Sequence, residues 1–272
     1  MKTPAGVLIP SGWRLRLAHH FGVGLQNNIR NLQELHAVYN EGQYYNTNAA
    51  GLVNIPNVVI NGEQATYLHF EQGVIAFADD HMTIETRGHP NGTISTGELV
   101  SKWAATRSFC VEARYKTPPQ QYTWPAFWFY GNAPGHDASE IDVEQPVTQW
   151  QGVHDVTMHN HPIEGAITIY NPQFTTQYMN WHDPSFDASA SPHFYTTCYD
   201  DDASTITRYI DGDKIYAAFN WKWNAMIGGT GKGPNPTLIF NLAVGGNWPG
   251  DTPNPQAFSA DLDLYSLDYF GP

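Results

Sequence analysis

Three acidic residues alternate with β-branched residues in the segment 139–146, which reads Ser-Glu-Ile-Asp-Val-Glu-Gln-Pro. Side chains at positions i, i+2 and i+4 of a β-strand share one face. The pattern therefore predicts a strand that presents Glu140, Asp142 and Glu144 on one face and its apolar residues to the core. Carboxylates so close together repel one another unless protons are shared or transferred. We expect the three acids to titrate as a coupled set, which suits proton-transfer chemistry.

An aromatic run, Trp-Pro-Ala-Phe-Trp-Phe-Tyr, occupies residues 124–130 just before the acidic segment. Aromatic faces stack on the apolar C–H faces of sugar rings, so acids beside such a run indicate polysaccharide hydrolysis. A retaining glycosidase needs two carboxyl groups about 5–5.5 Å apart. Residues i and i+4 of a flat strand have Cα atoms about 13 Å apart, so the two glutamates would have to lean together over a concave sheet. A solvated strand face or a calcium site are the simpler alternatives.

These residues resemble glycoside hydrolase family 16, the group of lichenases, laminarinases, agarases, carrageenases and xyloglucan transferases. The family signature Glu-x-Asp-x-Glu stands at residues 140–144. The resemblance covers roughly residues 70–272. Further blocks that fit in the family's order lie at residues 96–102, 109–118, 124–129, 209–212, 238–250 and 268–270.

The resemblance implies an all-β jelly roll of two curved antiparallel sheets with a concave substrate cleft. It also implies that Glu140 is the nucleophile, Glu144 the acid/base and Asp142 the assisting acid of a reaction with retention of configuration. No cofactor is required for this catalysis. Family members often bind a structural calcium ion on the convex side, where Asp268 is the matching carboxylate. The residues expected to bind substrate are Trp124, His159, Asn247 and Trp248.

Simpler interpretations remain open for several of these residues. Each tryptophan could pack in the core, and for Trp128 core packing is the favoured interpretation. His159 could equally contact substrate in the cleft or lie in a loop without a role in binding, because His161 follows two residues later.

The chain departs from parts of the family at two points. Many family glucanases carry an aromatic residue two positions before the nucleophile, where this chain has Ala138. Agarases and carrageenases usually insert one residue into the signature, which creates a β-bulge, whereas this chain has the regular form of lichenases. The alanine removes a sugar platform that laminarinases and lichenases have. The acidic strand with aromatic runs around it nevertheless leads us to expect a β-1,3-glucan or mixed-linkage β-1,3-1,4-glucan as the substrate of an endo-acting enzyme. The alternatives are a galactan hydrolase of the agarase, carrageenase or porphyranase type, a transglycosylase, and a carbohydrate-binding jelly roll without turnover.

The rest of the chain supplies the elements that would position these residues. Short runs rich in Val, Ile, Thr, Tyr and Phe recur from about residue 52, and Asn-Gly, Asp-Gly and Gly-Gly pairs separate them. Such spacing is typical of an antiparallel sandwich. Predicted strands include residues 82–86, 109–115, 166–170 and 205–210.

Two further local patterns concern the helix and the loops. The only predicted helix is short and lies within residues 25–40, with Asn27 or Asn28 as its cap. The proline-rich stretches 118–125 and 249–255 are predicted to be loops at the rim of the sandwich.

The composition excludes several classes of protein. The 272 residues carry a formal net charge of −13, so a nucleic-acid partner is not expected. Aromatic residues make up 14% of the chain, which excludes disorder, and no apolar run is long enough for a membrane span. We expect one domain over residues 1–272, with residues 1–60 as an unmatched extension or cleft wall. A secreted monomer acting on polysaccharide is expected, although no signal peptide is visible.

The chain contains two cysteines, Cys110 and Cys198. They could form a disulfide or remain two buried thiols. Lone cysteines within strand-like runs more often behave as small buried apolar residues, so the pattern favours thiols.

Overall fold

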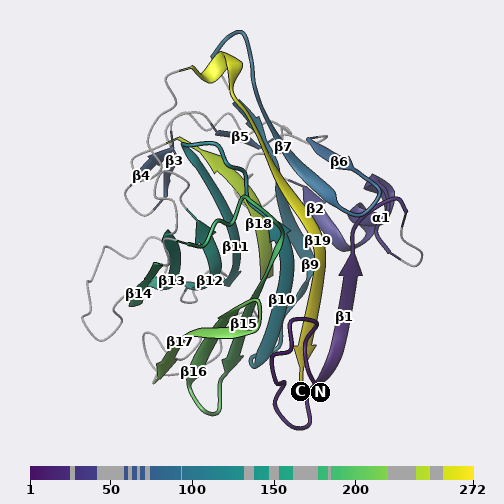
Figure 1. Ribbon diagram of the computed structural model, residues 1–272, viewed down its shortest axis with the longest axis vertical. Coiled ribbons are helices and arrows are strands. Elements are labelled where there is room, and N and C mark those ends of the chain that lie inside the picture. Colours follow the sequence, from purple (N-terminus) through teal and green to yellow (C-terminus); the bar gives the residue numbers. More distant parts are fainter. Residues whose placement is uncertain are drawn as a thin grey trace.

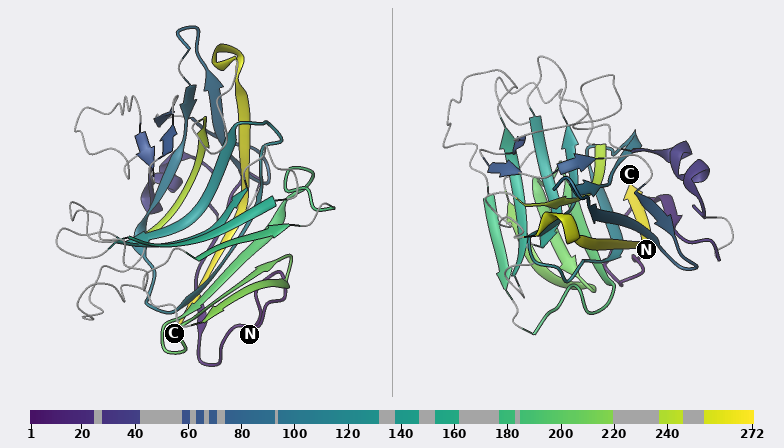
Figure 2. Two further views of the ribbon diagram at one scale, coloured as in Figure 1. Left: turned by 90° about the vertical axis from the view of Figure 1, so that its left-hand side faces the viewer. Right: turned by 90° about the horizontal axis from the view of Figure 1, so that it is seen from above.

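The computed structural model describes the chain outside residues 25–27, 42–57, 61–62, 66–67, 71–73, 93, 132–137, 147–152, 162–176, 183–184, 220–236 and 246–253. For strands β3–β5 and β12–β14, the description concerns the backbone alone. Within the described residues, two sheets lie over one another as curved layers (Figures 1 and 2). Both chain ends lie at the same end of the molecule (Figure 1).

The larger sheet has ten strands in the order β17-β16-β15-β10-β19-β7-β8-β5, with β1 also beside β19 and β6 beside β7. Its pairs are antiparallel except for the parallel pair β5–β8. Its strands are β1 (Arg14–His20), β5 (Leu68–Phe70), β6 (Ile75–Phe77), β7 (Met82–Gly88), β8 (Ile94–Thr96), β10 (Phe109–Lys116), β15 (His193–Asp200), β16 (Thr205–Ile210), β17 (Asp213–Phe219) and β19 (Ser259–Gly271).

The smaller sheet has seven antiparallel strands in the order β14-β13-β12-β11-β18-β9-β2. A separate hairpin pairs β3 (Val58–Ile60) with β4 (Glu63–Ala65). The strands of the smaller sheet are β2 (Tyr39–Glu41), β9 (Glu98–Ala104), β11 (Thr123–Gly131), β12 (Ala138–Pro146), β13 (Val153–His161), β14 (Gln177–His182) and β18 (Thr237–Val244).

The main core fills the space between the two sheets. Alternate residues of each strand point into it, as a period of two requires. Tyr115 of β10 packs against Phe127 of β11, and Phe127 stacks on Phe240 of β18 with ring centroids 4.3 Å apart. All three side chains are almost completely buried. The expected all-β jelly roll is thereby confirmed.

Several predicted strands and turns occur where the sequence placed them. The segments 82–86, 109–115 and 205–210 form β7, β10 and β16, whereas residues 166–170 lie outside the described part of the chain. Asp211 and Gly212 both have positive φ, 49° and 87°, and join β16 to β17. Two successive positive φ values match the twist of a two-residue hairpin, which explains the Asp-Gly pair.

The predicted helix exists, but its start was placed too early. Helix α1 spans Leu32–Val38, and the side chain of Asn31 caps it by accepting a hydrogen bond from the Glu34 backbone N–H at 3.0 Å. Ile29 is buried and exchanges backbone hydrogen bonds with His20 and Gly22. Because these bonds commit the Ile29 backbone to a sheet-like bridge, the helix begins only after it.

The proline-rich stretch 118–125 is not entirely a rim loop, because Trp124 and Pro125 lie inside β11. Pro125 pairs with Leu242 of β18, while β12 joins β11 only from Phe127 onward. One side of Pro125 therefore needs no ladder hydrogen bond, and a proline is tolerated there. In the second stretch, Pro255–Ala257 form a short 3-10 turn.

The N-terminal residues belong to both layers. Strand β1 pairs with β19 in the larger sheet, and β2 pairs with β9 in the smaller sheet. Residues 1–13 lie over the outer face of the larger sheet, where the backbone N–H of Ala5 donates to Glu112 at 3.0 Å. No helix among the described residues is long and apolar enough to cross a membrane.

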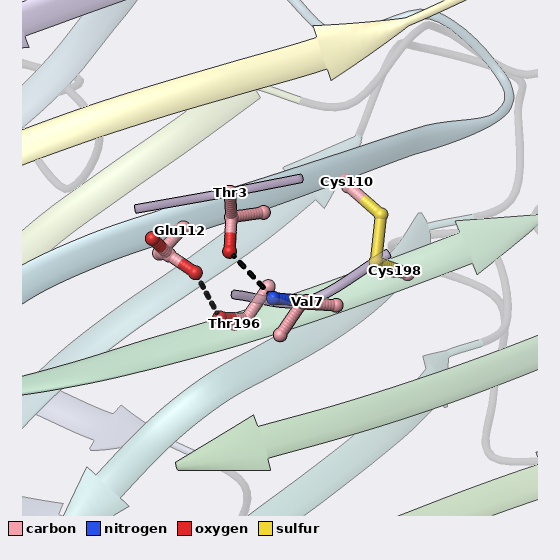
Figure 3. Close-up of a disulfide and its surroundings, with 6 residues drawn as sticks. All are labelled: Thr3, Val7, Cys110, Glu112, Thr196 and Cys198. Atoms are coloured by element: carbon pink, nitrogen blue, oxygen red, sulfur yellow. Dashed lines mark hydrogen bonds between the residues drawn. A yellow bond between two sulfur atoms is a disulfide. The ribbon is translucent and has the colours of Figure 1, made fainter. Parts of the chain in front are cut away.

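Cys110 and Cys198 form a disulfide (Figure 3), so the prediction of two thiols was wrong. The two residues stand directly opposite each other on β10 and β15, with Cα atoms 4.0 Å apart. They are separated by 88 positions in the sequence, so only the strand register brings them together. Ile9 and Phe270 pack with Cys110 in a small buried cluster.

Candidate active site

The acidic segment forms β12, an inner strand of the smaller sheet, as predicted. The aromatic run lies in β11, which pairs with β12 from Phe127 to Gly131. In this register Tyr130 stands opposite Glu140, and Trp128 stands opposite Asp142. The sheet therefore places the aromatic strand directly beside the three acids.

Strand β12 is not the regular strand that the signature predicted. Asp142 pairs with Trp128, and Glu144 pairs with the adjacent residue Phe127, so Val143 has no counterpart on β11. The ladder between β12 and β13 also changes register, between Ile141 and Gln145. Such a β-bulge interrupts the strict alternation of faces and re-aims side chains, often beside active sites. The spacing of the acids therefore departs from that of a flat strand between Asp142 and Glu144.

His159 lies in strand β13, not in a loop. It stands directly opposite Glu140 in the ladder between β12 and β13. Residues that pair directly across antiparallel strands have Cβ atoms about 4.5–5.5 Å apart and share a face. The register thus brings the predicted histidine to the predicted nucleophile, while a contact of His159 with substrate stays a prediction.

The two tryptophans of β11 differ in their surroundings. Trp128 is 5% exposed and packs with Val100 and Ile239 on the face of the smaller sheet that points away from the main core. Its indole Nε1–H donates to Asn241 Oδ1 at 2.8 Å. Trp128 is therefore buried, as the packing interpretation expects, but it lies in a separate cluster on this face and not in the main core between the sheets. Trp124 lies against the same cluster but keeps part of its surface exposed, which suits the predicted sugar platform.

Asn241 and Glu98 were missed as candidates by the sequence analysis. They pair directly across β18 and β9, and both are buried on the face that also carries Trp128. An asparagine inside the apolar run Leu-Ile-Phe-Asn-Leu-Ala-Val is the signal that could have indicated a buried polar contact. Asn247 and Trp248, which the sequence did single out, lie outside the described residues.

Asp268 is buried on the outer side of the larger sheet, directly opposite Glu112 of β10. Burial raises the pKa of Asp268 to about 6; the positive charge of His20 opposes this shift and the negative charge of Glu112 adds to it. The two carboxyl oxygens of Glu112 accept hydrogen bonds from Ala5 N–H at 3.0 Å and from the Thr196 hydroxyl at 2.7 Å (Figure 3 shows the bond to Thr196).

A calcium ion takes six to eight oxygen ligands. Asp268 and Glu112 supply two carboxylates, and both oxygens of Glu112 already accept hydrogen bonds from the protein. Across the described residues, no group of three or more His, Cys, Asp or Glu side chains is arranged to hold a metal ion. The residues present do not form a ready calcium site, and calcium binding at Asp268 stays a prediction.

Comparison with known proteins supports the resemblance stated above. No protein-family profile matches the chain. A curated relative, glucan endo-1,3-beta-glucosidase A1 of Niallia circulans, is 29% identical over 170 residues, which are 57% of this chain and 23% of the relative. The chain therefore matches less than a quarter of the length of that protein.

Solved structures match over almost the whole chain. The endo-1,3-beta-glucanase of Streptomyces sioyaensis has a TM-score of 0.69 at 18% identity and covers 97% of this chain and 98% of its own. The laminarinase catalytic domain of Thermotoga maritima has a TM-score of 0.68 at 19% identity over 96% and 98%. Beta-agarase A of Zobellia galactanivorans has a TM-score of 0.63 at 16% identity over 95% and 92%. The chain therefore has the jelly-roll fold of these laminarinase, endo-1,3-beta-glucanase and agarase structures.

Proposed function

We propose that the protein is a retaining endo-β-glycanase that hydrolyses β-1,3-glucan or mixed-linkage β-1,3-1,4-glucan by double displacement. One observation carries this proposal. Strand β12 holds Glu140, Asp142 and Glu144 inside a sheet of the laminarinase fold, with an aromatic strand on one side and His159 on the other. The curated relative, named as a glucan endo-1,3-beta-glucosidase, supports the choice of substrate.

In the proposed mechanism, Glu140 attacks the anomeric carbon while Glu144 protonates the oxygen of the leaving sugar. The glycosidic bond breaks and a covalent glycosyl-enzyme forms. Glu144, now a carboxylate, then takes a proton from water, and the resulting hydroxide displaces Glu140 from the sugar. Asp142, between the two glutamates in sequence, orients Glu140 and balances the charge that moves between them.

The composition and the disulfide support an extracellular enzyme that acts on a neutral polysaccharide. Only 14% of the residues are charged, which suits a neutral sugar polymer better than an ionic one. Disulfides persist in oxidising surroundings, and the bond between Cys110 and Cys198 fits a protein that works outside the cell. We propose a secreted monomer that needs no cofactor for catalysis.

The first experiment replaces each proposed catalytic glutamate, in Glu140→Gln and Glu144→Gln variants. Release of reducing ends from laminarin should fall at least about 10³-fold in each variant, while the thermal midpoint should stay that of the wild type. Asp202→Asn is the matched control, because Asp202 is exposed on a turn between β15 and β16. Wild-type turnover by either glutamine variant would refute the mechanism.

The second experiment identifies the substrate. A panel of laminarin, lichenan, xyloglucan, agarose, porphyran and carrageenan is assayed for new reducing ends, and NMR records the anomer released first. Release of the β-anomer supports retention.

Galactan hydrolysis is kept as a second candidate because the fold is shared with beta-agarase A. Products longer than the starting oligosaccharide would show transglycosylation, and binding without new reducing ends would show a non-catalytic protein.

A further inference from the structure

A second group of aromatic residues lies on the outer face of the larger sheet. The guanidinium of Arg114 on β10 lies between the rings of Phe194 on β15 and Tyr265 on β19, at 5.5 Å and 5.1 Å from the ring centroids. These three strands are neighbours in the sheet (Figure 1). All three side chains are partly exposed. Because Ala113 and Tyr115 point into the main core, Arg114 between them points outward.

A β-bulge brings Tyr265 to this position. Arg114 pairs with Ser266, and Tyr115 pairs with Leu264, so Tyr265 has no counterpart on β10. Leu264 is buried in the main core. The extra residue therefore turns the Tyr265 ring to the outer face, where it contacts Arg114. Bulges that re-aim one side chain are often features of binding sites.

The group continues onto the next strand. The His81 ring, just before β7, lies against Tyr265 with centroids 5.1 Å apart and planes inclined by 34°. Nδ1 of His81 is 2.7 Å from Asp80, and Nε2 is 3.7 Å from Asp263. Phe194, Arg114, Tyr265 and His81 together are here called the outer platform.

The N–H donors of the Arg114 guanidinium are not used within the described part of the chain. It forms no hydrogen bond and no ion pair within the described part of the chain, and its Nε is buried without a hydrogen-bond partner. An arginine carries five N–H donors in one plane. The ring contacts satisfy none of these donors, which need acceptor atoms. A ligand that carries acceptor oxygens could therefore bind to the accessible N–H groups.

We propose that the outer platform is a second binding site that holds a neutral polysaccharide chain on the sheet opposite the acidic strand. The ring faces of Tyr265 and Phe194 match the C–H faces of sugars, and the edge of Arg114 donates to sugar hydroxyl groups. Asp80 and Asp263 at the rim can accept from hydroxyls. These acids, with the net charge of −13, disfavour an anionic chain.

The outer platform and β12 belong to different sheets, so the site is separate from the proposed catalytic residues. The inference relies on the proposed function for the class of ligand and not for the binding itself. A site of this kind would keep the enzyme on an insoluble polymer while the cleft acts on one chain. It predicts a loss of polymer binding without a loss of turnover on short substrates.

The test compares the wild type with a Phe194→Leu/Tyr265→Leu double variant, which removes both rings and keeps apolar bulk. Depletion from solution by insoluble β-1,3-glucan should require about tenfold more polymer for the double variant, since each aromatic contact contributes a factor of about 2 to 13. Hydrolysis of soluble laminarihexaose should be unchanged. Tyr209→Leu is the matched control, because Tyr209 is partly exposed on the outer face of β16, pairs with Thr196 of β15 and lies two strands away from Arg114 of β10.

Arg114→Gln is a second test, because it removes the cation and keeps both rings. It should weaken polymer binding several-fold at an unchanged thermal midpoint. Wild-type binding by the double variant would overturn the inference, as would an equal loss in the Tyr209 control or a parallel loss of laminarihexaose turnover. Tighter binding of a sulfated polysaccharide than of the neutral glucan would overturn the proposed ligand. If the wild type binds glucan through the platform but hydrolyses no member of the panel, the proposed function alone fails.

Discussion

The two sheets hold their acidic residues in different ways. In the larger sheet, Glu112 is buried beneath the N-terminal residues, and each of its carboxyl oxygens accepts a hydrogen bond from the protein. In the smaller sheet, Glu140, Asp142 and Glu144 follow one another along a single strand, with a bulge between the last two. One sheet fixes a single acid with donors, whereas the other sheet gathers three acids.

We infer from this difference that Glu112 has a structural role, whereas the three acids of β12 are the proposed catalytic residues. Glu112 is buried and both of its carboxyl oxygens accept hydrogen bonds, so the loss of this side chain would leave its donors without an acceptor. We expect three carboxylates within five residues of one strand to repel one another when charged, and this repulsion would favour the proton transfers of the proposed mechanism. We therefore expect substitutions in β12 to change turnover and substitutions around Glu112 to change stability.

The largest expected effect is on turnover in the smaller sheet. Asp142→Asn keeps the size of the side chain but removes its charge and its ability to balance the proton on a neighbour. The rate constant kcat should fall by about 10²- to 10⁴-fold, and the thermal midpoint should not fall. Initial rates on laminarin and a thermal melt measure the two quantities. Asp213→Asn, at an exposed site on β17, is the control and should change neither. An unchanged kcat would remove Asp142 from the mechanism.

The second effect concerns the disulfide of the larger sheet. The bond closes a loop between residues separated by 88 positions, for which the chain-entropy relation gives about 4–5 kcal/mol of stabilisation as an upper value. A Cys110→Ala/Cys198→Ala variant should lose about 3 kcal/mol of unfolding free energy, or about 5 °C in midpoint. Its kcat at 25 °C should match that of the wild type. A midpoint that does not move would show that the native contacts alone hold β10 to β15.

The third effect concerns Glu112 itself. In a Glu112→Gln variant, one oxygen remains to accept from two donors, the partly buried Ala5 N–H and the buried Thr196 hydroxyl. The unpaired donor should lower the free energy of unfolding by about 1–3 kcal/mol. Relief of repulsion with Asp268 acts in the other direction but is smaller, because burial is the main cause of the raised pKa of Asp268. Urea denaturation measures the change, and Thr207→Val, at a partly exposed site on β16, provides the control. A loss of kcat with unchanged stability would contradict the comparison.

The sequence predicted the parts of this fold that depend on neighbours in the chain. Strands β7, β10 and β16 follow from alternating residues bounded by turn pairs, and β12 follows from its acidic pattern. The Asp-Gly pair at residues 211–212 predicted a hairpin because few other residues accept two positive φ values. In each case the physical cause acts over a few residues.

The features that sequence analysis misplaced depend on register between distant strands. Cys110 meets Cys198 only because β10 and β15 are aligned at that position. Pro125 is tolerated in β11 because the neighbouring strand joins later. The bulge at Val143 changes a spacing that looks regular in the sequence. Alternation within one strand carries no information on its partner, so none of these could be read from local pattern.

The smallest expected effect is on the pH dependence of stability, and it concerns the contact between β1 of the larger sheet and β2 of the smaller sheet. His19 of β1 in the larger sheet is within hydrogen-bond distance of Tyr39 of β2 in the smaller sheet, with Nδ1 and the hydroxyl 2.9 Å apart. Burial and, to a smaller extent, the adjacent His20 lower the pKa of His19 to about 4. An unfolded chain binds this proton near pH 6.5. Between pH 6.5 and 4 the unfolded state therefore holds more protons, and stability is lost as pH falls through this window.

The loss should reach about 1–2 kcal/mol, because His19 is only partly buried and solvent screening reduces the full effect. Urea midpoints of the wild type and of a His19→Gln variant between pH 7 and 4 measure it, and the variant should show the shallower slope. His20→Gln is the control: since burial is the larger cause, most of the slope should remain. Equal slopes for the wild type and His19→Gln would place the pH dependence elsewhere. A shallower slope for His19→Gln at unchanged turnover would show that a titrating group between the two sheets affects the stability of the protein. It would also show that this group does not affect the reaction proposed for β12.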